Sequence, residues 1–156
     1  MRYLEDFREG QVFELGEETI REQEILEFAR RFDAQPFHTD PEAAKKSMYG
    51  GLIASGWHTA SFFMGILVRG LIHDTASLGA GGIDELRWLK PVRPGDRLRG
   101  RLTVLGVRNS SKHPERGLLT CLGELFNQHG ERVLSIRWLA MIARRDRKST
   151  RLNSSH

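Results

Sequence analysis

The sequence contains little that would place the chain outside the cell or in a membrane. Cys121 is the one cysteine among 156 residues, so no disulfide can form within a single chain, and we expect a reducing compartment. The opening residues, MRYLEDFREG, hold no apolar run that could act as a signal peptide. The longest apolar stretch, residues 61–71, is interrupted by two glycines and an arginine, whereas a membrane helix needs about 20 apolar residues. We therefore expect a cytoplasmic protein with no membrane partner.

Acidic and basic side chains nearly balance outside the C-terminal residues. The formal net charge is +4, and residues 146–156 carry three basic side chains against one acidic side chain, which leaves +2 for the rest. This polar segment, DRKSTRLNSSH, has no periodicity. We expect it to be disordered and interpret it as a native tail or as a cloning or read-through scar. Because no basic face with interleaved aromatic residues occurs elsewhere, we do not expect a nucleic-acid partner.

The remaining residues, 1–145, are expected to form a single domain. The chain is 39% hydrophobic and 28% charged, which is typical of a soluble globular protein, and its length is enough to bury most of a core. The sequence shows no internal repeat and no stretch with the composition of a linker.

Three helices are predicted in the first half of the chain. Residues 21–32 place four apolar side chains on one helical face. A short polar helix should begin at Asp40, which is a good N-cap and is followed by proline. A third helix, residues 57–72, is apolar over most of its circumference, so we expect it to be nearly fully buried, with Ser55 as its N-cap.

The second half of the chain is predicted to form strands, in addition to an extended segment at residues 10–19. Four stretches alternate apolar and polar residues or end at turn signals: about residues 83–90, 97–104, 118–126 and 134–142. The glycine-rich residues 75–82 are expected to be a flexible connector. One apolar helix covered by one curved antiparallel sheet is an α+β architecture. Because exposed sheet edges invite pairing, we expect a homodimer or a higher homo-oligomer.

The most informative segment is residues 33–40, DAQPFHTD, in which Asp33 comes five positions before His38. A proline between them keeps this segment from being the interior of a helix. Three interpretations are open: an acid/base pair, part of a metal site with Asp40 and His58, or an ordinary loop before a capped helix. Asp40 is better explained as the N-cap, and the spacing matches no zinc signature, so we expect no metal.

This segment resembles the motif of the MaoC-like acyl dehydratases. The shared pattern is D-x-x-P-x-H-x-D at residues 33–40, with Phe-Ala at residues 28–29 before it and GLIASG at residues 51–56 after it. The sequence WLKPVRPGDRL, residues 88–98, resembles the family's proline-glycine-aspartate turn between strands, and the likeness spans roughly residues 8–143. The family includes the (R)-specific enoyl-CoA hydratases. Its fold is the hotdog, in which an antiparallel β-sheet wraps around a long central α-helix.

The resemblance implies a hydro-lyase acting on acyl-CoA thioesters. Such an enzyme adds water across the double bond of a 2-enoyl-CoA to give a 3-hydroxyacyl-CoA, or catalyses the reverse reaction. The resemblance assigns Asp33 and His38 the holding and activation of that water, and assigns the Gly56 backbone N–H to the thioester oxygen. Ser55 and Trp57 flank this glycine and are further candidates for oxyanion or substrate binding. The resemblance implies no metal and no organic cofactor.

The chemistry of these residue types agrees with that reaction. A carboxylate accepts a proton, an imidazole donates or accepts one near neutral pH, and a positioned acid/base group contributes typically about 10²–10⁴-fold. An N–H at the start of a buried helix, aided by the helix dipole, stabilises the charge that develops on a thioester oxygen.

Several assignments stay open on sequence alone. Gly56 could serve close packing instead of oxyanion binding, and His58 could line the pocket or bond to the backbone. The competing functions are a thioesterase on the same fold and a non-catalytic acyl-thioester binder. The chain departs from the family pattern at four positions, where relatives commonly carry a small residue, an asparagine, a histidine and, in some cases, a hydroxyl residue: Phe32, Gln35, Ser55 and Met64.

Overall fold

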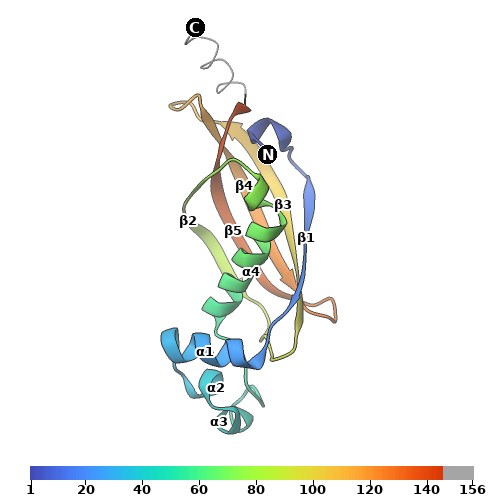
Figure 1. Cartoon of the computed structure of the whole chain (residues 1–156), viewed down its shortest axis with the longest axis vertical. Helices are drawn as coiled ribbons and strands as arrows, with labels where there is room; N and C mark the ends of the chain where they lie inside the picture. Colours follow the sequence, from blue (N-terminus) through green and yellow to red (C-terminus); the bar gives the residue numbers. More distant parts are fainter. Residues whose placement is uncertain (146–156) are drawn as a thin grey trace.

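One antiparallel sheet wraps a single long helix, and three smaller helices cover one end of the sheet (Figure 1). The computed structural model describes residues 1–145, so the tail expected at residues 146–156 lies outside the described residues. The strands are β1 (Val12–Thr19), β2 (Ser77–Trp88), β3 (Arg97–Asn109), β4 (Arg116–Phe126) and β5 (Arg132–Ala143). The helices are α1 (Glu22–Phe32), α2 (Pro36–Thr39), α3 (Pro41–Lys45) and α4 (Gly56–Gly70), with 3-10 turns η1 (Leu4–Asp6) and η2 (Ile72–Asp74).

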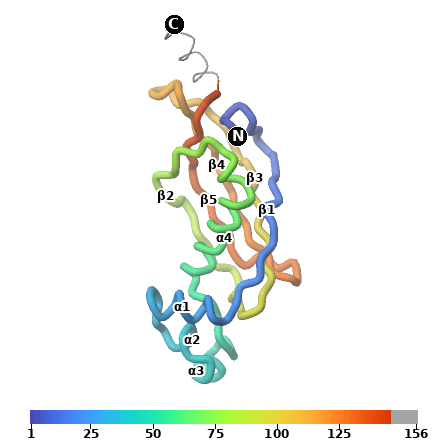
Figure 2. The backbone as a smooth tube through the Cα atoms, in the orientation of Figure 1, coloured from blue at the N-terminus to red at the C-terminus, as the bar shows by residue number. Residues whose placement is uncertain are grey.

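The sheet has the strand order β1-β3-β4-β5-β2, and every neighbouring pair is antiparallel. Figure 2 shows α4 running lengthwise along the sheet, with α1, α2 and α3 gathered beyond its N-terminal end. Residues of β4 alternate between buried and half-buried along the whole strand, because one face of the strand packs on the core. The α+β hotdog architecture expected from the sequence is confirmed.

Two strand glycines let α4 lie close against the sheet. A Cβ atom at Gly123 would lie 2.4 Å from Cζ of Phe63, and a Cβ at Gly100 would lie 2.8 Å from Cγ2 of Ile66. Both helix side chains are almost fully buried. The rings and methyl groups of α4 therefore occupy the space that strand side chains would otherwise fill, which places the helix axis near the backbone of the sheet.

The outer face of α4 is exposed, so the expectation that this helix is nearly fully buried is wrong for that face. Trp57, Met64 and Val68 are 58%, 45% and 39% exposed, respectively. The reason is geometric, because a single sheet curves around one side of the helix and leaves the other side uncovered. No helix within residues 1–145 combines the length and the apolar character needed to cross a membrane.

The glycine-rich segment expected to be a flexible connector is instead the first half of β2. Residues 77–82 belong to an edge strand that pairs with β5, although the register shifts three times between Ser77 and Glu85. Gly79 has φ +96°, a conformation that other residues rarely adopt. Backbone pairing to β5 needs no side chains, so the glycines permit an irregular strand where the sequence pattern indicated a loop.

The helices α1, α2 and α3 form a small layer at the N-terminal end of α4. Pro36 begins α2, a single helical turn that the sequence analysis did not predict, because proline fits the first position of a helix even though it breaks an interior. Asp40 caps α3 as expected, since its Oδ1 accepts from the N–H groups of Glu42 at 3.1 Å and Ala43 at 3.2 Å. His38 therefore lies on a single helical turn directly before a capped helix, and not on a loose loop.

Candidate active site

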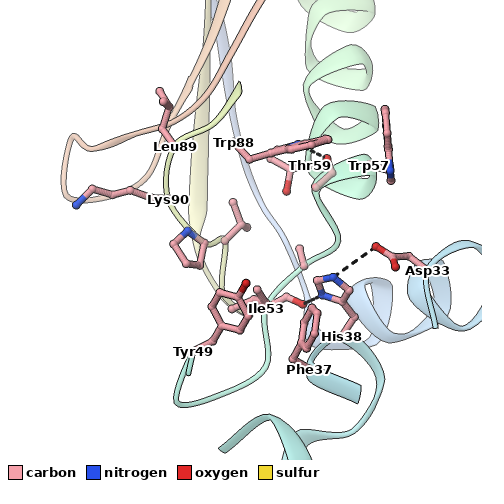
Figure 3. Close-up of a pocket in the computed structure, with 14 residues that line it drawn as sticks. Asp33, Phe37, His38, Tyr49, Ile53, Trp57, Thr59, Trp88, Leu89 and Lys90 are labelled. Carbon is pink, nitrogen blue, oxygen red and sulfur yellow. Dashed lines mark hydrogen bonds and ion pairs between the residues drawn. The ribbon is translucent and has the colours of Figure 1, made fainter. Parts of the chain in front are cut away.

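A cavity of about 340 Å³ lies where the N-terminus of α4 meets the end of β2 and the small helices (Figure 3). Asp33 and His38 lie on one side of it, as Figure 3 shows, and the segment from Trp88 to Val92 forms much of the opposite side. Aromatic side chains make up a large part of the wall: Phe37, Tyr49, Trp57 and Trp88.

His38 is buried and is fixed through both of its ring nitrogens. Its Nδ1 lies 2.7 Å from the carbonyl oxygen of Ile53, and a carbonyl can only accept, so Nδ1 carries a proton. The other nitrogen, Nε2, points at Oδ2 of Asp33 over 3.4 Å. A second hydrogen bond joins the same two segments, since the Ile53 N–H donates to the carbonyl of Phe37 at 3.1 Å. In the neutral ring, Nε2 is therefore an acceptor that faces the carboxylate.

Asp33 follows the last residue of α1, and both of its carboxylate oxygens accept hydrogen bonds. Gln35 Nε2 donates to Oδ1 at 2.6 Å, and Ser55 Oγ donates to Oδ2 at 2.7 Å. Partial burial raises the pKa of Asp33, but these two hydrogen bonds and the charge of His38 outweigh it, so the pKa lies below its usual value of 3.8. Asp33 is therefore an anion at neutral pH.

The Asp33–His38 pair leaves two acceptors facing one small space. A carboxylate oxygen and an unprotonated imidazole nitrogen 3.4 Å apart do not hydrogen-bond each other unless a proton lies between them. A water molecule that reaches both groups would donate one proton to each. The arrangement is thus able to hold a water and to take a proton from it.

Gly56 is the first residue of α4 and lines the cavity. Within residues 1–145 its N–H donates no hydrogen bond, as is usual for the first N–H groups of a helix. The close-packing alternative is also realised, because a Cβ at residue 56 would lie 2.4 Å from Cε2 of Trp88. The indole Nε1 of Trp88 donates to the Gly56 carbonyl at 2.7 Å. The oxyanion role of Gly56 stays a prediction.

Ser55 and Trp57 occupy different environments, although both flank Gly56. Ser55 is fully buried and caps α4 as expected, since its Oγ accepts from the Trp57 N–H at 3.3 Å. Its own hydroxyl proton goes to Asp33 and not toward the cavity. Trp57 lines the cavity, and its ring meets that of Trp88 edge-on, with 5.1 Å between the centroids.

Comparison with known proteins shows which family the chain belongs to. A family model described as "MaoC like domain" matches residues 6–118. The chain belongs to the MaoC-like domain family. Its hotdog fold is shared with the crystal structure of a MaoC-like dehydratase from Rhodospirillum rubrum, with 41% identity and a TM-score of 0.86 over 93% of this chain and 99% of that one.

Two relatives of this MaoC-like chain cover most of its length. An (R)-specific enoyl-CoA hydratase from Rhodospirillum rubrum is 32% identical over 111 residues, which are 69% of this chain and 72% of that protein. The uncharacterized protein YdeM from Bacillus subtilis (strain 168) is 30% identical over 131 residues, which are 83% of this chain and 91% of that protein.

The sequence did not predict all of the residues that line the cavity. Trp88 and Tyr49 line the cavity. Trp88 opens the segment 88–98 and Tyr49 closely precedes the segment 51–56, but their residue types alone carry no signal for this role. Thr59 also lines the cavity. It lies one helical turn after Ser55, whose carbonyl accepts from the Thr59 N–H at 3.0 Å.

Neither role that the sequence left open for His58 is observed, since it lies outside the cavity lining and its buried Nδ1 has no hydrogen-bond partner within residues 1–145. Its ring stacks on Phe28 with centroids 4.8 Å apart and 9° between the planes, and it does not line the cavity. Burial lowers the pKa of His58, although Glu24 acts in the opposite direction. Within residues 1–145 no group of three or more histidine, cysteine, aspartate or glutamate side chains is arranged to hold a metal ion.

Proposed function

We propose that this MaoC-like chain is an enoyl-CoA hydratase or dehydratase. It would add water to a 2-enoyl-CoA thioester or remove water from a 3-hydroxyacyl-CoA. The observation that carries the proposal is the approach of His38 Nε2 to Asp33 Oδ2 over 3.4 Å, in a cavity that also contains the start of α4. The (R)-specific enoyl-CoA hydratase from Rhodospirillum rubrum, 32% identical to this chain, supports the assignment.

The proposed reaction uses the pair as both base and acid. A water held between Asp33 and His38 loses a proton to the pair as its oxygen bonds to C3 of the enoyl group. The electron pair of the C2–C3 double bond moves toward the thioester, and negative charge builds on the thioester oxygen. The same proton then returns to C2, so that the elements of water are added and the pair is restored.

The N-terminus of α4 is suited to stabilise the developing charge. Gly56 N–H is the first donor of a helix that spans residues 56–70, and it lines the same cavity as the pair. The positive end of the helix dipole adds to the effect of this N–H. The Trp88 ring covers the α-carbon of Gly56 and keeps part of this end of the cavity apolar, where such an interaction is stronger than in water.

We also propose that the protein acts in the cytoplasm as a homodimer formed through β2. The β1 edge carries Glu14, Glu17 and Glu18, and charged side chains block edge pairing. The β2 edge begins with uncharged residues and exposes Leu78 and Ile83, close to the uncovered apolar face of α4. Antiparallel pairing of β2 with a second copy would cover both surfaces and satisfy the edge N–H and C=O groups.

An assay with crotonyl-CoA tests the proposed activity. Hydration removes the enoyl absorbance without releasing a thiol, a thioesterase releases free CoA thiol, and a binding protein changes neither signal. We expect loss of absorbance alone, and a decrease of about 10²–10⁴-fold in the Asp33→Asn and His38→Ala variants. Asp40→Asn is the matched control, because asparagine also caps a helix and Asp40 does not line the cavity. Thiol release, no signal change over a series of acyl lengths, or full activity of both variants would refute the proposal.

A further inference from the structure

We propose that Ser55 is a positioning residue that ties the carboxylate of Asp33 to the N-terminus of α4. Its effect on turnover rests on the proposed hydratase function, whereas its effect on the carboxylate does not. The inference assigns Ser55 a role different from the oxyanion or substrate binding expected from the sequence.

The hydroxyl of Ser55 has two hydrogen-bond partners. It donates its one proton to Asp33 Oδ2 at 2.7 Å and accepts from the Trp57 N–H at 3.3 Å. The backbone of Ser55 is held as well, because its carbonyl accepts from the N–H of Thr59 at 3.0 Å and from the Thr59 Oγ1 at 3.3 Å. Ser55 is fully buried, so water does not compete for these bonds.

The bond to Asp33 connects two parts of the site that are 22 positions apart in the chain. Asp33 comes from the end of α1, whereas Gly56, the residue after Ser55, begins α4. A shift of α1 relative to α4 would separate the proposed base from the proposed oxyanion N–H. One short hydrogen bond to a charged acceptor, which is stronger than a neutral bond, opposes that shift.

Ser55 acts on the oxygen that matters for His38. Oδ2 of Asp33 accepts from Ser55 and also faces His38 Nε2 at 3.4 Å. Gln35 donates to the other oxygen, Oδ1, and lies at the exposed side of the carboxylate. Loss of Gln35 would therefore expose the carboxylate to water, which can replace the lost donor, whereas loss of Ser55 would remove the donor from the partly buried oxygen that faces His38.

A purely structural role as N-cap makes a different prediction from a positioning role. In either role, removal of the hydroxyl lowers the stability of the protein. Only the positioning role changes the ionisation of Asp33, since a donated hydrogen bond favours the charged form of a carboxylate. The pKa of Asp33 is therefore the quantity that separates the two roles.

The ring protons of His38 provide a probe of that pKa. The chain has six histidines, so proton–carbon NMR spectra of the rings are simple, and the His38→Gln variant identifies the His38 signals. Because Asp33 lies beside Nε2, its titration at acidic pH shifts those signals. We expect the acidic inflection to move to higher pH in Ser55→Ala and to return in Ser55→Thr. Asp40→Ala, which removes the N-cap of α3, should leave the inflection unchanged.

Turnover gives a second readout that depends on the proposed activity. With crotonyl-CoA near neutral pH, we expect Ser55→Ala to lower kcat about tenfold with KM within about twofold, and Ser55→Thr to recover most of kcat. If the wild-type chain has no hydratase activity, the proposed function fails, yet the NMR titration still decides the role of Ser55.

Two results would overturn the inference. One is an acidic inflection in Ser55→Ala at the same pH as in the wild type. The other is an equal shift in Asp40→Ala, which would mean that loss of any nearby cap moves Asp33. If Ser55→Ala does not fold, Ser55→Cys keeps the shape with a weak donor, and its inflection should then lie above that of the wild type.

Discussion

The indole of Trp88 lies directly against Gly56, donates its N–H to the Gly56 carbonyl at 2.7 Å, and occupies the space that a side chain at residue 56 would need. These residues are 32 positions apart in the chain. The contact joins the end of β2 to the start of α4, and it sets the position of the first N–H group of that helix.

Gly56→Ala should therefore destabilise the protein by about 1–3 kcal/mol, because the new methyl group meets the Trp88 ring. It should also lower the rate of the proposed hydratase reaction, by about tenfold, because the first N–H of α4 is displaced. Urea unfolding measures the first effect. Trp88→Ala in the Gly56→Ala background should relieve the clash, so the two changes should cost less together than the sum of their separate costs. Additive costs would contradict this account of the contact.

His58→Phe should stabilise the protein, and increasingly so at acidic pH. The phenyl ring keeps the stack on Phe28 and removes Nδ1, a buried atom with no hydrogen-bond partner within residues 1–145. A change of about 1 kcal/mol is expected at neutral pH.

The pH dependence of that variant follows from the buried imidazole. Burial lowers the pKa of His58 below 6.5, so the unfolded chain binds this proton more tightly than the native protein. Wild-type stability therefore falls as the pH drops below about 6.5, and the variant lacks this loss. Urea unfolding at pH 7 and pH 5 should give a larger difference between the two proteins at pH 5. A constant difference would show that His58 has no linked proton.

Gly123→Ala should destabilise the core by about 1–3 kcal/mol, because its Cβ would lie 2.4 Å from Cζ of the buried Phe63. Gly81→Ala is the matched control on another strand, since a Cβ there has no atom within 4 Å. Thermal unfolding of both variants measures the effect. Equal melting temperatures for the two variants would mean that α4 moves away from the sheet without a loss of stability, which contradicts this prediction.

Ile83→Lys should weaken self-association, since it places a charge at the exposed edge of β2. Val12→Lys is the control, because Val12 is exposed to a similar degree on β1, the opposite edge of the sheet. Sedimentation velocity should detect monomers of the first variant and dimers of the second. If Val12→Lys dissociates the protein and Ile83→Lys does not, the dimer interface lies at the β1 edge and the proposed β2 interface is wrong.

The sequence predicted the features that depend on local spacing. The caps at Asp40 and Ser55 and the alternation along β4 each arise from neighbouring residues. The predicted apolar face of α1 is buried at Ile25 and Ala29, but it leaves Phe32 62% exposed at the end of the helix. The approach of His38 to Asp33 was implied by the resemblance of residues 33–40 to the family motif, whereas the residues alone left a metal site and an ordinary loop open.

Features that depend on distant segments could not be predicted in the same way. Trp88 reaches Gly56 because the end of β2 lies beside the start of α4, a contact between distant segments that no local spacing specifies. The direction of the Ser55 hydroxyl depends on where α1 ends in space, which no spacing specifies. The exposed face of α4 arises because the sheet covers one side of the helix, whereas the apolar pattern surrounds the helix on most sides.

The two hydrogen bonds between α2 and Ile53 determine which part of the cavity wall can change in sequence without moving His38. His38 Nδ1 donates to the Ile53 carbonyl, and the Ile53 N–H donates to the Phe37 carbonyl, so the ends of the segment between them are joined independently of its contents. That segment includes Tyr49, which contributes to the cavity wall. Insertions, deletions or exchanges at residues 46–51 would therefore reshape the cavity while the histidine keeps its place.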